Sequence, residues 1–185
     1  LQSIIIKEKS TKTKYYVGES LDLSGIKVIA VYDTGEEEIY EGEELNVENI
    51  LYFRGKINQE EMDYICLDME EKVKAFGCKK IGVPITVTYG VVDGIADVEI
   101  NVPIDKAVDD FDNYRFKKNL IVKNALKFEY IGEIGQMPKA SAVLNDYISQ
   151  KKLNVITPSF NIVEIKQGET VEIKLTVYIG VGADI

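Results

Sequence analysis

The sequence of 185 residues contains neither histidine nor tryptophan. Without histidine, the chain cannot build a serine or cysteine triad with an imidazole base, or a zinc site with an imidazole ligand. No run approaches the ~18 consecutive apolar residues that a membrane-spanning helix needs. A phosphate-binding P-loop and a G-x-S-x-G nucleophile elbow are missing as well. We therefore expect a protein that is not an enzyme, that uses no cofactor and that has no transmembrane segment in this chain.

Acidic side chains outnumber basic ones by 31 to 22, which gives a net charge of −9. This balance disfavours a nucleic-acid partner, because neutralisation of phosphates supplies most of that affinity. The charge is uneven: residues 1–105 hold 11 basic and 21 acidic side chains, and residues 106–185 hold 11 and 10. Such asymmetry predicts two units with different surfaces. We place them at residues 1–104 and 105–185.

Short alternating runs separated by turn residues dominate the first unit. The clearest strand covers residues 26–32, in which alternate side chains are apolar. Asp33-Thr34-Gly35 predicts a hairpin turn after it, with residues 36–40 as the returning strand. Further strands are predicted at residues 4–6, 14–17, 21–23, 84–90 and 96–102. Strands and turns at this spacing are typical of a β-sandwich.

Residues 11–28 read TKTKYYVGESLDLSGIKV. This run resembles the signature of the bacterial Ig-like domains of group 3, and residues 82–90 (GVPITVTYG) are similar to the closing strand of that family. The resemblance covers roughly residues 3–103. It implies an Ig-like sandwich that serves as a non-catalytic spacer or adhesion domain of a bacterial surface protein. Thr34, which stands before the glycine of the hairpin, departs from the family's pattern.

The segment 51–80 is longer than the family leads us to expect. Residues 59–65 and 68–74 are charged and rich in helix-forming residues. We interpret the segment as an insertion with one or two helical turns. It is either a functional loop or a solvated cover over a sheet edge.

The second unit, residues 105–185, carries no familiar motif. Residues 138–149 have apolar side chains at the 3.6-residue period of an amphipathic helix, with Pro138 near the first turn. Strands are predicted at residues 119–130, 153–156, 160–165 and 170–179. A small mainly-β domain and a small α+β domain both fit this pattern.

Three groups of side chains are candidates for chemistry. Cys66 and Cys78 could form a disulfide in an oxidising compartment, or could be two buried thiols. Asp109, Asp110 and Asp112 could bind calcium at the junction of the units, or could form a solvated acidic linker. The last group, a run of glutamates around the first hairpin, is either a solvated face or a docking surface for a basic partner. Its members are Glu36, Glu37, Glu38, Glu41, Glu43 and Glu44. None of these groups is assigned as a catalytic, cofactor or metal site.

The eleven tyrosines raise the possibility of a ligand that stacks on rings. Tyr15, Tyr32 and Tyr89 fall at strand positions and fit a core or an edge, whereas Tyr114 and Tyr130 cannot be placed. A carbohydrate or cell-wall polymer ligand predicts a row of exposed tyrosines, and a spacer predicts scattered ones. A subunit of a surface assembly would instead offer an unpaired strand at residues 170–179.

Taken together, these features predict a mainly β, non-catalytic module of a bacterial surface protein. A surface protein or a glycan is the expected partner, and the chain is expected to be a monomer. Because the chain begins at Leu1, we expect a signal segment to have been removed. The family resemblance implies an extracellular or cell-surface location.

Overall fold

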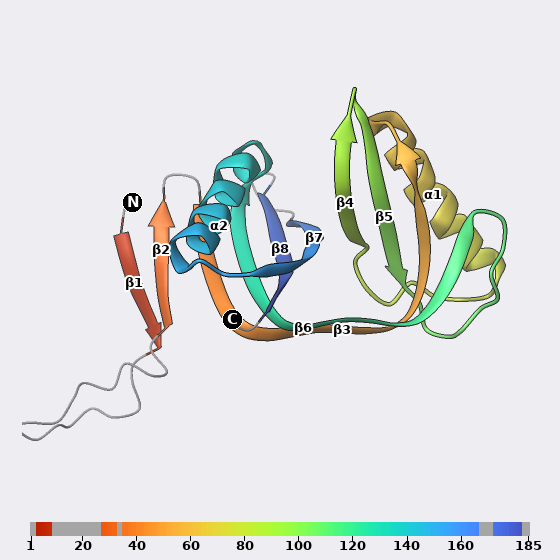
Figure 1. Ribbon diagram of the computed structural model, residues 1–185. Coiled ribbons are helices and arrows are strands. Elements are labelled where there is room, and N and C mark those ends of the chain that lie inside the picture. Colours follow the sequence, from red (N-terminus) through yellow and green to blue (C-terminus); the bar gives the residue numbers. More distant parts are fainter. Residues whose placement is uncertain (1–2, 9–26, 33–34, 167–171, 183–185) are drawn as a thin grey trace, which may run out of the picture.

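The computed structural model describes residues 3–8, 27–32, 35–166 and 172–182. Eight strands and two α-helices follow one another along the chain (Figure 1). Their bounds are β1 (Ser3–Glu8), β2 (Lys27–Tyr32), β3 (Gly35–Ile57), α1 (Gln59–Ala75), β4 (Ile85–Val92), β5 (Ile95–Pro103), β6 (Tyr114–Glu133), the 3-10 turn η1 (Ile134–Gln136), α2 (Met137–Lys151), β7 (Val155–Lys166) and β8 (Glu172–Val181). The mainly β fold that the sequence predicts is confirmed.

Six of the strands close into a ring. The order β3-β5-β4-β7-β8-β6 returns to β3, because β3 pairs with both β5 and β6. The hairpin of β1 and β2 extends the sheet from the start of β3. All of these pairs are antiparallel. Two packed sheets were expected, and the Ig-like sandwich is therefore not confirmed.

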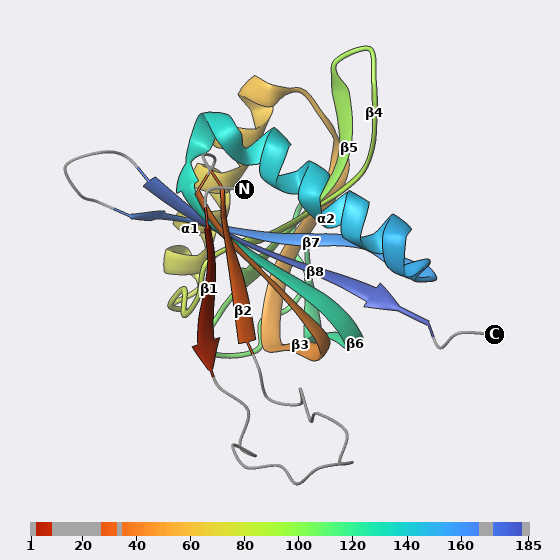
Figure 2. The same ribbon diagram turned by 90° about the vertical axis from the view of Figure 1, so that its left-hand side faces the viewer.

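The ring is built from two halves with the same order of elements. A long strand, a helix and a hairpin occur first as β3-α1-β4-β5 and then as β6-α2-β7-β8. In Figure 1 the two long strands run antiparallel along the bottom and rise at both ends, so that β3 ends on the side of α1 and β6 ends on the side of α2. Figure 2 shows α2 lying across the strands of its half. We call the set β3-α1-β4-β5 the first half and the set β6-α2-β7-β8 the second half.

The two helices begin in different ways. Asn58 caps α1 by accepting a hydrogen bond from the Glu61 amide at 2.9 Å, and the Glu61 carboxylate accepts one from the Asn58 amide at 2.8 Å. This reciprocal pair is a capping box, which satisfies two backbone donors at the helix start. Helix α2 has no side-chain cap and has a proline in its first turn. Both helices bury one face against the sheet of their own half.

Three clusters of buried side chains make up the core. In the first half, Ile65, Met69 and Val73 of α1 pack on β3 and β5. In the second half, Ala140 and Leu144 of α2 pack on β6 and β8. The third cluster joins the halves, with buried residues from β3, β4, β6 and β7: Leu45, Ile50, Ile85, Val87, Leu120, Val122, Ala125 and Phe160. Every cluster draws on segments far apart in the sequence.

Several predicted elements are confirmed. The strands at 4–6 and 26–32 are β1 and β2, and β2 forms a hairpin with β3. The strands at 84–90 and 96–102 are β4 and β5, joined by a turn at Asp93 and Gly94, both with positive φ. Such a turn matches the twist of a hairpin. The helix at 138–149 is α2, and strand β6 contains the run at 119–130. The predicted strands at 14–17 and 21–23 lie outside the described residues.

The segment 51–80 differs from what was expected. Its first seven residues continue β3, and α1 then spans 17 residues instead of one or two turns. The helix covers a face of the sheet rather than a sheet edge, because its apolar stripe is buried.

Strand pairs between β3 and β6 cross the division predicted at residues 104 and 105. No helix among the described residues is long and apolar enough to span a bilayer.

Candidate functional site

A hollow among the described residues lies between α1 and the start of β6. It has a volume of about 770 Å³. Its walls come from the end of β3, one face of α1 and the turn before β6. The lining residues are Phe53, Ile57, Glu61, Tyr64, Ile65, Asp68, Lys72, Asp112, Asn113 and Tyr114. We call this hollow the α1–β6 crevice.

The spacing along α1 brings polar side chains to the crevice. Glu61, Tyr64, Asp68 and Lys72 are separated by three or four residues and therefore share one face of the helix. Glu61 is held in place by the capping box. The neighbouring stripe anchors the helix in the core, so the crevice face is presented from a fixed support.

Aromatic rings form the floor and one end of the crevice. Tyr114 is 5% exposed, and its ring centroid lies 6.3 Å from that of Phe53 and 5.4 Å from that of Phe111. Phe76 extends this cluster, with its ring centroid 4.2 Å from that of Phe111. Tilted pairs at these distances are favourable arrangements of two rings. The floor is therefore packed and apolar.

Two polar contacts connect α1 with the opposite wall. The Tyr114 hydroxyl donates a hydrogen bond to the Asp68 carboxylate. Burial, together with this carboxylate, raises the pKa of Tyr114 well above its ordinary value, so the hydroxyl stays protonated. The Lys72 ammonium lies 3.6 Å from the Asp112 carboxylate across the crevice. These contacts fix the width of the hollow.

Tyr64 is the most exposed ring at the crevice, with 70% of its surface accessible. Near it stand Glu61 and Asp68 as acceptors and Asn113, whose amide group both donates and accepts. Ring faces next to a few hydrogen-bonding groups suit a ligand that is polar at its rim and apolar on its faces. A sugar ring has this character.

Of the predicted acidic cluster, Asp112 lines the crevice, and the carboxylates of Asp110 and Asp112 have protein partners. Asp110 accepts a hydrogen bond from the Phe116 amide at 2.8 Å and lies 3.7 Å from Arg115. Asp112 pairs with Lys72. In the part of the chain that the structure describes, no three histidine, cysteine, aspartate or glutamate side chains form a group that could hold a metal ion. Of the two alternatives for this cluster, calcium binding has no support from this geometry.

Cys66 and Cys78 are free thiols. Cys78 is buried in the core of the first half, and Cys66 is half-buried against the same cluster. Burial raises the pKa of the Cys66 thiol, and the carboxylates of Asp63 and Glu70 raise it further. The structure thus has the arrangement of two packed thiols rather than the disulfide.

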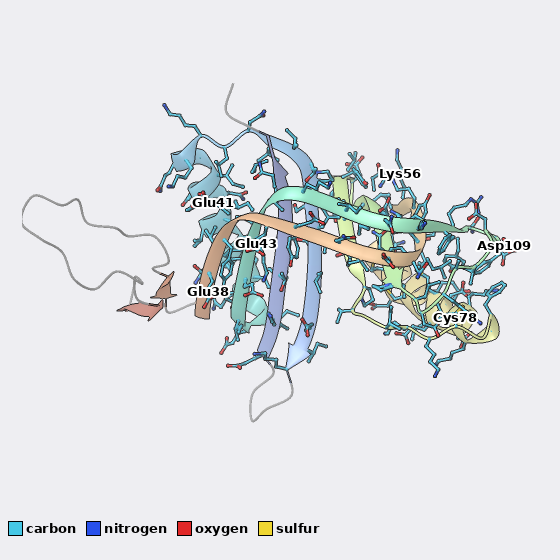
Figure 3. All side chains as sticks on the ribbon, turned by 90° about the horizontal axis from the view of Figure 1, so that it is seen from below. Glu38, Glu41, Glu43, Lys56, Cys78 and Asp109 are labelled. Carbon is cyan, nitrogen blue, oxygen red and sulfur yellow. The ribbon has the colours of Figure 1, made fainter. Side chains whose placement is uncertain are left out.

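The glutamates of the first hairpin do not share one environment. Glu37 is 4% exposed, whereas Glu41 and Glu44 lie on the surface. A solvated face and a docking surface were the two alternatives for these glutamates, and Glu37 fits neither, because strand alternation turns this residue toward the core. Figure 3 shows Glu38, Glu41 and Glu43 at the opposite end of the molecule from Lys56 and Asp109. These glutamates lie far from the crevice.

The tyrosines divide between core and surface. Tyr114 and Tyr130, which the sequence could not place, are buried. Tyr89 is 48% exposed, and its ring lies 3.6 Å below the Arg54 guanidinium. Tyr15 and the side chain of Tyr32 lie outside what the structure describes. Among the described residues the exposed tyrosines are Tyr64 and Tyr89, which form no row, so the tyrosines are scattered as the spacer predicts. Of these two, Tyr64 lines the α1–β6 crevice.

Strand β8, which contains most of the predicted strand at 170–179, is not an unpaired edge. It pairs with β6 on one side and with β7 on the other. The prediction of an assembly that forms by adding a strand at this position is therefore wrong.

Sequence reasoning missed the crevice itself. The signal was present, because Glu61, Tyr64, Asp68 and Lys72 recur at helical spacing. The high charge of the segment concealed it, and the short helix that we expected could not carry four residues on one face. The contribution of Phe53 and Tyr114 could not be foreseen, because it depends on the pairing of β3 with β6.

Comparisons with known proteins give two kinds of similarity. A family model, the bacterial Ig-like domain (group 3), matches residues 9–50. The predicted resemblance is confirmed over this stretch, which ends within β3. No curated protein matches the sequence.

Among solved structures, the chain is similar to EcmrR in the cryo-EM structure of its DNA complex, with a TM-score of 0.62 and 9% identity over 78% of this chain. The chain spans 57% of that EcmrR chain. The crystal structure of the EcmrR C-terminal domain has a TM-score of 0.59 and 12% identity, over 79% of this chain and 96% of that one. A hydrolase from Listeria innocua has a TM-score of 0.43 and 10% identity, over 80% and 93%. The fold of this chain is therefore that of the EcmrR C-terminal domain.

Proposed function

We propose that this chain is a non-catalytic adhesion module of a bacterial surface protein and that it binds a glycan in the α1–β6 crevice. The sequence left adhesion and spacing open. One observation favours adhesion: the exposed Tyr64 ring stands beside hydrogen-bonding side chains at a hollow of about 770 Å³. A spacer needs no such hollow.

The remaining features support a binding role without catalysis. The chain has no histidine to act as a base near neutral pH. In the crevice, Asp68 already accepts a hydrogen bond from Tyr114, and Asp112 pairs with Lys72. The match of residues 9–50 to a bacterial Ig-like domain supports surface display and an extracellular location.

A role in nucleic-acid binding is the less favoured candidate. EcmrR is seen in complex with DNA, but the part that resembles this chain is its C-terminal domain. The present chain carries a net charge of −9, so it lacks the overall surplus of cations from which nucleic-acid binding draws most of its affinity. We propose that the module acts as a monomer on a glycan and not on nucleic acid.

A glycan and cell-wall polymer array tests this proposal. We expect the intact chain to bind a subset of glycans, with the same pattern with and without calcium. Tyr64→Ala removes the exposed ring, and we expect it to weaken binding about tenfold, as is typical of aromatic anchors.

Leu67→Ala is the matched control. Leu67 lies on the same helix and is 65% exposed, but it does not line the crevice. Binding that survives Tyr64→Ala unchanged, or that Leu67→Ala weakens equally, would place the ligand elsewhere. If the chain binds none of the polymers on the array, the proposal that its ligand is a glycan is contradicted.

A further inference from the structure

A second hollow adjoins the crevice and is lined by cations, although the chain as a whole is acidic. It has a volume of about 500 Å³, and three of its lining residues are the cations Arg54, Lys56 and Arg115. Phe53 and Asn113 line both this hollow and the α1–β6 crevice. We call it the cationic hollow. In a chain with a net charge of −9, three cations around one hollow need an explanation.

The strand register explains why these cations meet. Tyr52 of β3 lies opposite Arg115 of β6, and directly opposed residues share a face of the sheet. Arg54 and Lys56 follow on that same face, because alternate residues of a strand point the same way. The described pairing of β3 with β6 ends at Phe53 and Tyr114. Beyond that point no described strand covers this edge of β3, and the hollow opens there.

Two of the three cations are already engaged. Arg54 forms a two-pronged contact with Asp97, at 2.7 and 3.1 Å, and lies over the Tyr89 ring. Arg115 donates to the carbonyl oxygens of Asp112 and Tyr114, both at 2.9 Å, and lies 3.7 Å from Asp110. Their positions are therefore fixed, and part of their charge is compensated.

Lys56 differs from both arginines. The residue opposite it on β5 is Asp97, whose carboxylate is taken by Arg54. Lys56 forms no ion pair with any other residue that the structure describes. It is exposed, and it also borders a smaller hollow of about 380 Å³ beside Tyr89. Its ammonium is thus available to a ligand.

We propose that the glycan of the α1–β6 crevice is acidic and that Lys56 binds its anionic group in the cationic hollow. This inference rests on the proposed function. Lys56 supplies the uncompensated charge, Asn113 supplies amide donors, and the two arginines add a positive potential. Strand alternation places Phe53 and Ile57 on the α1 face of β3 and Lys56 on the opposite face. One chain of sugars with a ring in the crevice and an acidic group in the hollow would therefore pass over the uncovered edge of β3, where Phe53 and Asn113 line both hollows. A carboxylate and a phosphate group share this chemistry.

The test compares two oligosaccharides that differ only in charge. Titration of the full-length chain with hexagalacturonate and with its carboxyl-reduced form isolates the contribution of the carboxylates. We expect the acidic form to bind about tenfold more tightly at low salt, and the difference to shrink as salt screens the charges. Inorganic phosphate at millimolar concentration should compete if the hollow also accepts phosphate groups, and its failure to compete would assign the hollow to carboxylates.

Lys56→Gln should abolish most of the preference for the acidic form, and Lys56→Glu should reverse it. The control is Lys118→Gln, which removes an exposed strand lysine that does not line either hollow. Equal binding of the two oligosaccharides by the wild-type chain would overturn the acidic preference and leave the proposed function intact. If the wild-type chain binds neither oligosaccharide and no polymer on the array, both the acidic preference and the proposed glycan binding are overturned. A preference that survives Lys56→Gln would also contradict the assignment.

Discussion

The two halves of the molecule share one order of elements but differ in what they leave open. In the second half, Phe128 and Tyr130 of β6 are fully buried beneath α2. In the first half, α1 stands over a crevice, and the cations at the end of β3 border a second hollow. The same layout therefore carries different surfaces in the two halves, and the binding surface that we propose lies on the first. Identical topology does not fix function, because function depends on the side chains at the ends of the strands.

The largest expected effect tests the packed half. Phe128→Ala removes a fully buried ring, and we expect the free energy of unfolding to fall by about 3–5 kcal/mol. Phe53→Ala, at the crevice, should cost less than half as much, because Phe53 is only partly buried. Urea denaturation of both variants measures the difference. Equal losses would contradict the contrast between the halves.

The next effect tests the two helix starts. Asn58→Ala removes the cap of α1, and we expect a loss of about 1 kcal/mol. Gln136→Ala at the start of α2 should cost almost nothing, since its side chain makes no cap hydrogen bond and its buried Oε1 has no partner among the described residues. Asn58→Ser, which keeps a capping oxygen, is the control. Thermal unfolding followed by circular dichroism distinguishes these outcomes.

A smaller effect concerns pH in the second half. Burial raises the pKa of Glu129, but hydrogen bonds and charges from Lys174 and Lys127 outweigh it, so the pKa is lower than usual. A carboxylate with a lowered folded pKa stabilises the fold above its unfolded pKa of about 4.5, and this contribution disappears as pH falls through the folded pKa. Glu129→Gln should therefore reduce stability at pH 7 by about 0.5 kcal/mol and flatten the decline below pH 4.5. An unchanged pH profile would contradict this role.

The smallest effect is chemical and leaves stability unchanged. Cys66, half-buried in the first half, should react slowly with iodoacetamide at pH 7, because burial raises its thiol pKa. Cys78 is buried and should react more slowly still. In the unfolded, unreduced protein both thiols should be labelled. Detection of only one or neither by mass spectrometry would indicate a disulfide or another modification.

Local patterns predicted the local elements. The helix at 138–149 could be predicted from the helical periodicity of a short stretch of sequence. The hairpin of β4 and β5 could be predicted from alternating apolar residues interrupted by Asp93-Gly94. The long strands could not be predicted in this way. Strand β3 pairs with β6 over most of its length, and that register joins residues that are 61 to 95 positions apart, from Phe53–Tyr114 to Glu36–Ile131. No window of sequence contains this information.

The repeated order of elements also escaped sequence analysis. The runs IADVEINVP and EIKLTVYIGV alternate alike, and each closes one half. Their common role becomes visible only when both are seen beside their own helix (Figures 1 and 2). The cationic hollow is hidden for the same reason, since Arg54 and Lys56 meet Arg115 only through the β3–β6 register.

The most direct test of the account maps the ligand on the intact chain. Hydrogen exchange followed by mass spectrometry, with and without saturating hexagalacturonate, reports where the backbone becomes protected. We expect protection to be confined to the first-half surface, namely α1, the end of β3 and the turn before β6. Protection centred on α2, β7 and β8, or no change anywhere, would contradict the claim that the first half is the binding half.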